Sequence, residues 1–326
     1  MELKRRNRIL RNNSSIRALV SETQISVNDF IVPFFICEGE KYKHEISSMP
    51  GYFRLSLDNT IEEVKHLWQL GFKAVLLFVK VSDELKDNTG KEALNPEGLM
   101  QKSIRAIKKA VPEMLVFTDV ALDPFSSFGH DGIVKDEQIV NDETVEVLAK
   151  MSLSHAQAGA DFVAPSDMMD GRIAAIRTIF EQHGFTRTGI LSYSAKYASS
   201  FYGPFRDALD SAPGFGDKKT YQMDYSNTDE AIKESVMDAE EGADLLLVKP
   251  AGAYLDIIHR VKQRTNLPLV AYQVSGEYAM IKAASQKGWL DEEAAVMESI
   301  TAIKRAGADI IISYFAKDIV EKYLRK

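Results

Sequence analysis

The sequence predicts an α/β protein with a (β/α)8 TIM barrel and an extended N-terminal arm, on the basis of three observations. Eight short apolar runs recur along the chain, and segments with helical periodicity separate most of them. Glycines typical of helix C-termini precede several of these runs. The length of 326 residues suits one barrel with extensions, so it does not require a second domain.

Residues 1–30 are predicted to form the arm, and residues 31–326 the barrel domain. Six cationic residues and one acid, Glu2, fall within residues 1–20 of a chain whose net charge is −7. Such a segment could be a solvated tail, a nucleic-acid contact, a transit peptide or an arm that reaches an acidic neighbouring subunit. Four apolar residues favour an amphipathic segment that docks: Leu10, Ile16, Leu19 and Val20.

The apolar runs are predicted to be strands buried on both faces, because parallel strands covered by helices have nearly continuous apolar sequences. The runs cover residues 31–36, 73–79, 114–120, 161–164, 189–193, 244–248, 267–274 and 309–314. Helices are predicted over residues 143–158, 172–182, 229–241, 254–264 and 291–305. The capping-box pattern Thr60-Ile61-Glu62-Glu63 predicts a further helix that begins at Thr60.

A weak internal repeat supports the alternation of helices and strands. Gly71, Gly159, Gly242 and Gly307 each follow a helical segment and precede an apolar run. Glycine suits the position after the last helical turn because it adopts a left-handed conformation without a steric penalty. An open doubly wound sheet is the main alternative, but no glycine-rich dinucleotide loop follows the first strand.

Composition argues against several classes of protein. The negative net charge disfavours general nucleic-acid binding, which depends on cationic contacts to phosphate. A single cysteine, Cys37, allows no internal disulfide and is compatible with a reducing compartment. The apolar runs are shorter than the roughly 18 residues needed to span a bilayer, and residues 1–20 lack a signal-peptide core. We therefore expect a cytoplasmic protein without membrane or nucleic-acid partners.

Two lysines stand at the predicted carboxyl ends of adjacent strands, where barrel enzymes carry their active sites. Lys249 directly follows the sixth apolar run, and Lys196 lies three residues after the fifth. A lysine buried at such a place can be ion-paired, and the candidate partners are Asp119, Asp123 and Asp131. It can instead be a neutral amine that attacks a ketone and forms a Schiff base.

The Schiff-base hypothesis requires an amine that is neutral near pH 7. Lowering a lysine pKa from about 10.4 to about 7 costs roughly 4.6 kcal/mol. A second ammonium about 6 Å away supplies roughly 2.8 kcal/mol at an effective dielectric of about 20. Proximity alone therefore falls short, and burial at the apolar strand end has to supply the remainder.

The long connection after the fifth strand, residues 195–227, is predicted to contain an active-site lid over about residues 197–222. The lid carries Arg206, Lys218 and Gln222. One interpretation is that they are surface groups of a mobile loop; the other is that they bind a substrate carboxylate. In the second interpretation the substrate is an acid that carries a ketone.

Further polar residues follow the ends of other predicted strands. Ser275 and Tyr314 would add neutral hydrogen-bond donors opposite the lid. Asp119, Asp123 and Asp131 lie at or after the end of the third strand. These aspartates could simply form turns, or they could bind Mg²⁺, which prefers oxygen ligands. The lack of cysteine in this loop argues against a structural zinc site.

Four segments carry a resemblance to a known family: residues 164–172 (APSDMMDGR), 194–197 (SAKY), 248–256 (VKPAGAYLD) and 272–280 (YQVSGEYAM). In this order they resemble the signature segments of the porphobilinogen synthase (δ-aminolevulinic acid dehydratase) family. With the arm, the resemblance covers essentially the whole chain. It implies a lyase that condenses two 5-aminolevulinate molecules to porphobilinogen with loss of two waters, in tetrapyrrole (heme and chlorophyll) biosynthesis.

The resemblance implies two substrate sites, each with its own lysine. Lys249 would form the Schiff base at the P-side site, where Ser275 and Tyr314 would hold that substrate's carboxylate. Lys196 would form the Schiff base at the A-side site. The A-side carboxylate would lie against three lid residues: Arg206, Lys218 and Gln222.

The resemblance also carries expectations about metals and assembly. Zinc-dependent members have three cysteines where this chain has Ala121, Asp123 and Asp131, so it resembles the branch without them and no catalytic zinc is expected. Together with Asp119, the two aspartates would line the A-side pocket and position the substrate amine. Glu234 matches an allosteric Mg²⁺ ligand. The arm would embrace a neighbouring subunit within a homo-octamer.

Two other functions remain open from the residues alone. A class I aldolase also uses a barrel lysine, but it needs only one and usually a phosphate site. A non-catalytic barrel would bind a small acid or a partner protein. Borohydride reduction in the presence of 5-aminolevulinate distinguishes these functions through the adduct on Lys249.

Overall fold

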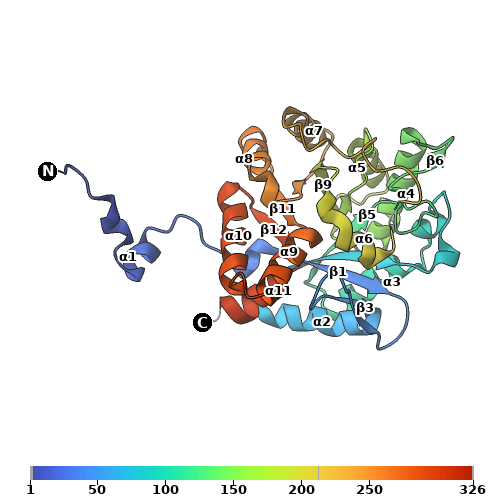
Figure 1. Cartoon of the computed structure of the whole chain (residues 1–326). Coiled ribbons are helices and arrows are strands. Elements are labelled where there is room, and N and C mark those ends of the chain that lie inside the picture. The colour runs from blue at the N-terminus through green and yellow to red at the C-terminus, as the bar shows by residue number, and fades with distance from the viewer. Residues whose placement is uncertain (1–2, 212, 325–326) are drawn as a thin grey trace.

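The computed structural model describes residues 3–211 and 213–324, and within them parallel strands close into a barrel surrounded by helices (Figure 1). The barrel strands are β1 (Phe30–Cys37), β4 (Ala74–Lys80), β5 (Leu115–Val120), β8 (Phe162–Pro165), β9 (Gly189–Lys196), β10 (Leu245–Lys249), β11 (Leu269–Gln273) and β12 (Ile310–Ser313). They pair in this order, and β12 also pairs with β1. That last pairing closes the sheet and excludes the open doubly wound alternative.

All eight predicted apolar runs are barrel strands, and five of the strands (β1, β4, β8, β9 and β10) continue one to three residues beyond the carboxyl end of the predicted run. β9 ends on Lys196 and β10 ends on Lys249, so both lysines are strand residues. The two lysines are direct partners in the register of the parallel pair β9–β10. Adjacent strands therefore deliver both amines to the same edge of the barrel.

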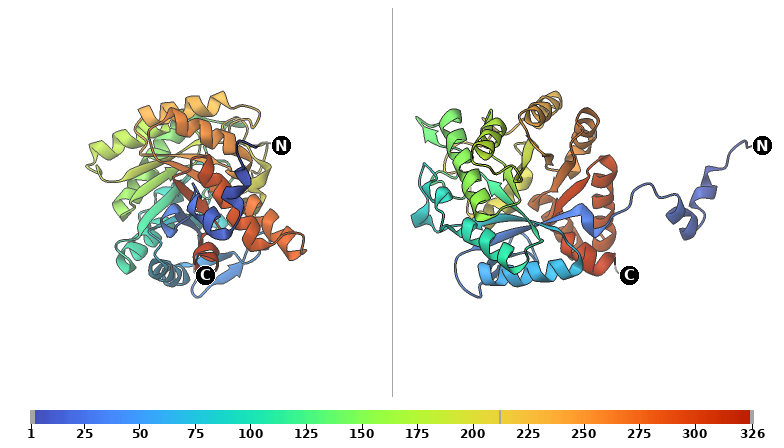
Figure 2. Two further views of the ribbon diagram at one scale, coloured as in Figure 1. Left: turned by 90° about the vertical axis from the view of Figure 1, so that its left-hand side faces the viewer. Right: turned by 180° about the vertical axis from the view of Figure 1, so that it is seen from behind.

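The main helices alternate with the strands and cover the outside of the barrel (Figure 2). They are α2 (Leu57–Leu70), α3 (Leu99–Ala110), α4 (Asn141–Ala158), α5 (Arg172–Gln182), α7 (Asp229–Glu240), α8 (Leu255–Arg264), α9 (Ser275–Gln286) and α10 (Glu292–Ala306). After β12 the chain continues through α11 (Ala316–Asp318) and a π-helical turn over Ile319–Tyr323. The five predicted helices without a capping box agree with these bounds to within two residues.

The capping-box prediction for α2 was wrong about where the helix begins. The helix starts at Leu57 after Ser56, three residues before Thr60. The hydroxyl of Thr60 donates to the Ser56 carbonyl at 2.9 Å, which places Thr60 inside the first turn and not at its cap. Serine at position 56 is itself a residue type preferred at helix N-termini.

Helix α9 was not predicted, and Gly276 in its first turn is a residue of low helix propensity. The structure explains this glycine: a Cβ at position 276 would lie 2.5 Å from the carbonyl oxygen of Phe201. The start of α9 therefore packs directly against the lid backbone. Helix α3 was also not predicted.

The glycines of the internal repeat end helices as predicted. Gly71, Gly159, Gly242 and Gly307 have φ of 101°, 104°, 106° and 126°, which is the left-handed region that favours glycine. Two short hairpins add to the barrel: β2 (Lys43–Glu45) with β3 (Phe53–Ser56), and β6 (Val134–Lys135) with β7 (Gln138–Ile139). The second hairpin lies in the connection after β5.

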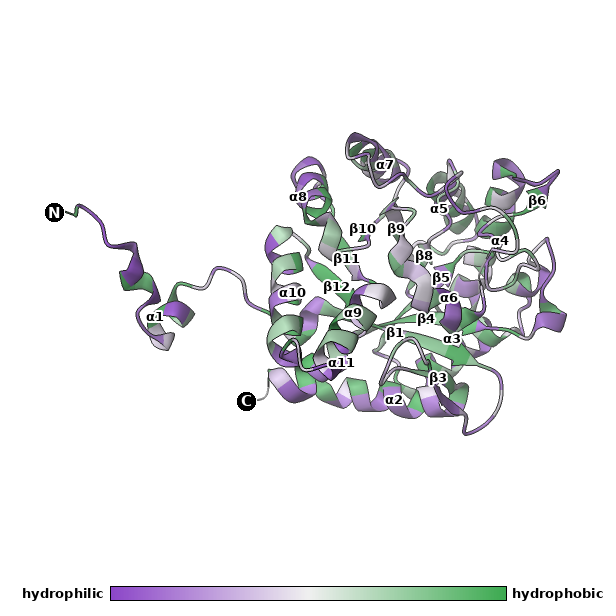
Figure 3. Ribbon diagram, in the orientation of Figure 1, coloured by the Kyte–Doolittle hydropathy of each residue, from purple (hydrophilic) through white to green (hydrophobic). Residues whose placement is uncertain are grey.

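The apolar core lies inside the barrel and between the strands and their helices. All eight residues of β1 and all five of β10 are buried. In Figure 3 the strands are mostly hydrophobic, whereas the outward sides of the helices are hydrophilic. This pattern is the expected one for parallel strands enclosed by helices.

The N-terminal segment projects away from the barrel (Figures 1 and 2). It contains a 3₁₀ turn, Asn7–Arg11, and the short helix α1 (Ser14–Leu19), capped by the Asn13 side chain. Leu10 is 55% exposed and Leu19 is 85% exposed. Exposed leucines on a projecting segment are typical of a surface that contacts a partner. Among the described residues, no helix is sufficiently long and apolar to cross a membrane.

Candidate active site

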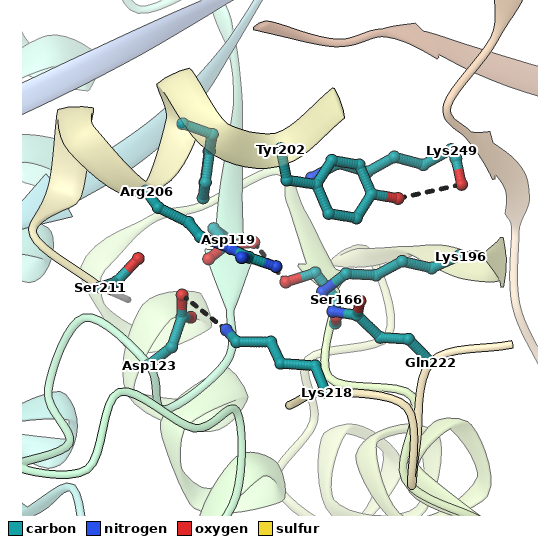
Figure 4. Close-up of a pocket in the computed structure, with 11 residues that line it drawn as sticks. Asp119, Asp123, Ser166, Lys196, Tyr202, Arg206, Ser211, Lys218, Gln222 and Lys249 are labelled. Carbon is teal, nitrogen blue, oxygen red and sulfur yellow. Dashed lines mark hydrogen bonds and ion pairs between the residues drawn. The ribbon is translucent and has the colours of Figure 1, made fainter. Parts of the chain in front are cut away.

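Both lysines enter one cavity at the carboxyl ends of β9 and β10, beneath the lid (Figure 4). Lys249 is 5% exposed and Lys196 is 6% exposed. The lid is partly helical, with a 3₁₀ turn over Ser200–Tyr202 and helix α6 (Gly203–Leu209). The cavity is lined by Asp119, Asp123, Ser166, Lys196, Tyr202, Phe205, Arg206, Ser211, Lys218, Gln222 and Lys249.

Aromatic rings enclose the amine of Lys249. Its Nζ atom lies 4.8 Å from the ring centroids of Phe205 and Tyr272, 4.9 Å from that of Tyr202 and 5.4 Å from that of Tyr193. Within the described chain, no carboxylate forms an ion pair with this amine. Tyr202 also donates a hydrogen bond to the Lys249 carbonyl at 3.2 Å, so the lid both covers and holds this residue.

Burial in this aromatic enclosure, together with the nearby charge of Lys196 as the second cause, lowers the pKa of Lys249 from 10.5 to about 7. The aspartates of the cavity oppose the shift without reversing it. A change of this size corresponds to roughly 5 kcal/mol in favour of the neutral amine. Burial is the larger cause, as the sequence argument required.

Lys196, in contrast, is ion-paired. Its Nζ atom lies 3.0 Å from Oδ2 of Asp131 and also donates to the carbonyl oxygen of Ser166. Each of the two interpretations from the sequence therefore applies to one of the two lysines. Ion pairing describes Lys196, and an unpaired amine in an apolar enclosure describes Lys249.

Asp131 connects Lys196 to the lid. Its other oxygen, Oδ1, lies 2.5 Å from Nζ of Lys218, and that Nζ is 3.4 Å from Oδ2 of Asp123. Burial alone would raise the pKa of Asp131, but the two ammonium groups outweigh burial and lower it to about 2. Asp131 is therefore ionised at neutral pH, with both oxygens held by lysines.

Asp119 has the opposite character. Burial and the neighbouring carboxylate of Asp123 raise the pKa of Asp119 to about 7, although a 2.7 Å hydrogen bond from Ser166 acts against this. A carboxyl group with a pKa near 7 can both accept and donate a proton under physiological conditions. Asp119 is therefore suited to acid–base chemistry beside the two lysines.

Arg206, Lys218 and Gln222 line the lysine cavity, as predicted for the lid. The Oε1 atom of Gln222 is buried without a hydrogen-bond partner in the described protein. The same three residues also line a cleft of about 770 Å³ outside the lid. The closed cavity itself holds about 20 Å³, which is room for about one water. Entry of a larger substrate thus requires the lid to move.

Ser275 and Tyr314 do not line this cavity. The Tyr314 hydroxyl is 2.8 Å from the hydroxyl of Tyr272, one of the rings around Lys249. The Ser275 hydroxyl donates to the Phe201 carbonyl of the lid at 3.5 Å. Tyr314 therefore contacts a ring of the aromatic enclosure, and Ser275 contacts the lid backbone. Their contact with a substrate carboxylate stays a prediction.

Sequence reasoning missed the cluster behind Lys196. The guanidinium of Arg172 is 2% exposed and lies 3.3 Å from both oxygens of Asp238 and from the hydroxyl of Ser192. This cluster joins α5, α7 and β9. Arg172 belongs to the APSDMMDGR segment, but nothing in that segment indicates a partner 66 residues away.

Glu234, the predicted Mg²⁺ ligand, lies on α7 outside the lysine cavity. It is half-buried in a pocket of about 260 Å³ that it shares with Asp170, Glu230 and the lid residue Tyr221. Burial and the charge of Asp238 raise its pKa. In the described part of the chain, no group of three His, Cys, Asp or Glu side chains is arranged to hold a metal ion.

A closed parallel barrel with two buried lysines side by side at its carboxyl edge has the architecture of an enzyme that uses amine nucleophiles. The lid and the cationic residues that line the cavity add a site for a small acidic molecule.

Comparisons with known proteins identify the family. The family profile described as delta-aminolevulinic acid dehydratase matches residues 4–322. The enzyme of that name from Chlamydia pneumoniae is 52% identical over 98% of this chain and 97% of that protein. The chloroplastic enzyme of Glycine max is 52% identical over 97% of this chain and 77% of that protein. The chain belongs to the delta-aminolevulinic acid dehydratase family.

A solved structure agrees with this assignment. The delta-aminolevulinic acid dehydratase (porphobilinogen synthase) of Toxoplasma gondii ME49, in complex with the reaction product porphobilinogen, is 49% identical to this chain. It superimposes with a TM-score of 0.97 over 99% of this chain and 92% of that chain. The similarity extends over arm and barrel together.

Proposed function

We propose that this protein is a porphobilinogen synthase that condenses two 5-aminolevulinate molecules to porphobilinogen with loss of two waters, in tetrapyrrole biosynthesis. One observation carries the proposal: the unpaired Lys249 amine, with a pKa near 7, lies directly beside Lys196 in a cavity that also contains Arg206. A class I aldolase would need only the first lysine. A binding barrel would not need an amine held neutral.

Lys249 is the nucleophile for the first substrate. Its neutral nitrogen attacks the ketone carbon, a C–N bond forms, the amine loses both hydrogens and the carbonyl oxygen leaves as water. The aromatic rings exclude bulk water and keep the amine unprotonated before attack. Ser275 and Tyr314 are proposed to hold this substrate's carboxylate once the lid has rearranged around it.

Lys196 forms the Schiff base with the second substrate. It must first lose the proton that its ion pair with Asp131 stabilises. Asp119 is the group suited to take that proton and to return it to the departing oxygen, because its pKa lies near 7. The aspartates also provide acceptors for the substrate's ammonium group.

The carboxylate of the second substrate is proposed to bind Arg206, Lys218 and Gln222. Arg206 offers two parallel N–H donors that match a carboxylate. These residues line both the closed cavity and the outer cleft, so they can contact the substrate during entry and after lid closure.

Turnover without zinc is the first testable consequence. The positions where zinc-dependent relatives were expected to have cysteines carry Ala121, Asp123 and Asp131, and both aspartates contact Lys218 in this structure. Purified protein is expected to produce one porphobilinogen per two 5-aminolevulinate molecules. The rate of porphobilinogen formation should be unchanged when a zinc-selective chelator is added together with Mg²⁺. Product is quantified by mass spectrometry.

An authentic zinc-dependent relative treated in the same way provides the control, since its activity should disappear and return with zinc. Loss of activity in this protein, followed by rescue with zinc, would contradict the zinc-free proposal. Failure to form porphobilinogen under any metal condition would contradict the proposed function itself.

We also propose an allosteric Mg²⁺ at Glu234 and a homo-octamer in which the arm contacts a neighbouring subunit. Mg²⁺ keeps several of its waters and commonly binds proteins through one or two carboxylates, so a single half-buried glutamate fits it. When bound, the ion would supply a positive charge beside the acidic side chains of this pocket. The exposed leucines of the cationic arm support a role in subunit contact.

Replacing Glu234 by alanine is expected to weaken stimulation by Mg²⁺ about tenfold or more and to shift the assembly towards smaller oligomers. The physical reason is the loss of the carboxylate that would bind the ion. Activity as a function of Mg²⁺ and sedimentation velocity with and without Mg²⁺ provide the two measurements. The variant Glu240→Ala, on the exposed side of the same helix, is the matched control. Wild-type behaviour in both measurements would remove Glu234 from the metal site.

We propose a cytoplasmic location, which is supported by the single cysteine, because one cysteine is compatible with a reducing compartment. Several plant relatives carry the word chloroplastic in their names.

A further inference from the structure

A buried histidine joins the lid to the loop after β5. His130 is 0% exposed, and both of its ring nitrogens have partners in the lid. Nε2 lies 3.0 Å from the carbonyl oxygen of Phe215, and Nδ1 lies 3.1 Å from the hydroxyl of Tyr221. The Phe215 ring also packs against the imidazole, with 4.8 Å between centroids. One side chain therefore holds two points of the lid that are six residues apart.

The partners determine which atom donates each hydrogen bond. The Phe215 carbonyl can only accept, so Nε2 of His130 carries the hydrogen. In the neutral ring Nδ1 is then an acceptor, and the Tyr221 hydroxyl donates to it. The oxygen of Tyr221 in turn accepts the backbone N–H of Asp131 at 3.3 Å. Burial raises the pKa of Tyr221, which keeps its hydroxyl protonated as this arrangement requires.

The hydrogen-bond chain ends at the reacting lysine. Asp131, whose backbone N–H donates to Tyr221, binds Lys196 through one carboxylate oxygen and Lys218 through the other. Lys218 itself belongs to the lid. The position of the Asp131 carboxylate thus depends on how the lid packs over the cavity, and the position of the Lys196 amine depends on Asp131.

We propose that His130 is a positioning residue that couples closure of the lid to the orientation of Asp131 and thereby of Lys196. It does not contact the reacting atoms. When the lid is closed, the hydrogen bonds of His130 and Tyr221 fix the position of Asp131. Asp131 in turn orients the amine of Lys196, so Lys196 is correctly oriented only when the substrates are enclosed. The proposal rests on the proposed function, because it assigns the role within that reaction.

Two substitutions separate the hydrogen bonds from the packing of the ring. His130→Phe keeps an aromatic ring against Phe215 but removes both hydrogen bonds. His130→Gln provides one N–H donor and one carbonyl acceptor, so it can reproduce the donor to Phe215 and the acceptor for Tyr221. Tyr221→Phe removes the hydroxyl from the other side and serves as an independent variant. His183→Phe, at an exposed histidine bonded only to its own helix, is the matched control.

We expect His130→Phe and Tyr221→Phe each to lower kcat about tenfold at saturating substrate, and the double variant to be little worse than either single variant. A loss in kcat distinguishes this role from simple weakening of substrate binding, which would raise KM alone. His130→Gln should recover most of the lost kcat, and His183→Phe should match the wild type.

A second measurement does not depend on activity. Lys219 lies in the lid, and its side chain is 70% exposed in this structure. Trypsin can cleave after Lys219 when the lid opens and its backbone enters the protease active site. Cleavage there, followed by mass spectrometry without substrate, is expected to be about tenfold faster in His130→Phe and in Tyr221→Phe than in the wild type or His130→Gln. If the wild type made no porphobilinogen while this pattern appeared, the proposed function would fail and the attachment of the lid would stand.

Either of two results would overturn the proposal. One is wild-type kcat and wild-type lid cleavage in both His130→Phe and Tyr221→Phe. The other is equal impairment of His130→Gln and His130→Phe, which would mean that the paired hydrogen bonds are not the cause.

Discussion

Replacement of Lys249 by alanine is expected to lower turnover by about 10⁴-fold or more while the barrel remains folded. The variant loses the nucleophile itself, and no neighbouring group can replace it, because Lys196 is held by Asp131. The fold should persist, since burial of an amine costs free energy that the variant no longer has to offset. Steady-state kinetics and thermal unfolding followed by circular dichroism test the two parts separately.

Covalent trapping identifies the role of Lys249 directly. Borohydride reduction with 5-aminolevulinate should attach one substrate to Lys249 in the wild type and none in the alanine variant, as read by peptide mass spectrometry. The reaction should also depend on pH with a definite sign. Since the pKa of Lys249 is lowered to about 7, the amine is neutral above this pH, and trapping should fall about tenfold per unit below it.

Lys65→Ala, at an exposed lysine paired with Glu62, is the control and should behave as the wild type. Normal turnover in Lys249→Ala, or reduction of the wild type that leaves no adduct on Lys249, would refute the covalent role. Trapping that stays constant from pH 8 to pH 5 would contradict the lowered pKa.

Replacement of Lys196 by methionine is expected to abolish porphobilinogen formation, by about 10³-fold or more, while the first substrate still reacts with Lys249. Methionine keeps much of the side-chain volume but removes the charge and the nucleophile. Asp131 retains Lys218 as a partner, so its carboxylate does not become a lone buried charge. Reduction should therefore trap one substrate on Lys249 without product release.

The same variant tests the electrostatic coupling of the two lysines. The charge of Lys196 is the second cause of the lowered Lys249 pKa, after burial. Its removal should move the pH midpoint of trapping upwards, which would be measured by mass spectrometry over a pH series. A midpoint unchanged from the wild type would show that burial alone sets the amine pKa. Full product formation would refute the two-lysine mechanism.

The sequence alone was sufficient for the barrel and for the place of the two lysines at its carboxyl edge. The apolar runs marked all eight strands, and the four glycines marked helix ends, because both signals depend on short segments of chain. Lys196 and Lys249 could be placed side by side because each follows an apolar run, and the two runs form neighbouring strands. The requirement for burial around an unprotonated amine followed from the size of the pKa change.

The tertiary structure decided what each lysine contacts. The partner of Lys196 lies 65 residues away at Asp131, and the rings around Lys249 come from β9, β11 and the lid. His130 meets lid residues 85 and 91 positions further along the chain. Sequence periodicity records which face of an element is buried, whereas the free energy of a buried charge depends on the few atoms that surround it. Those atoms are brought together only when the barrel closes and the lid packs onto it.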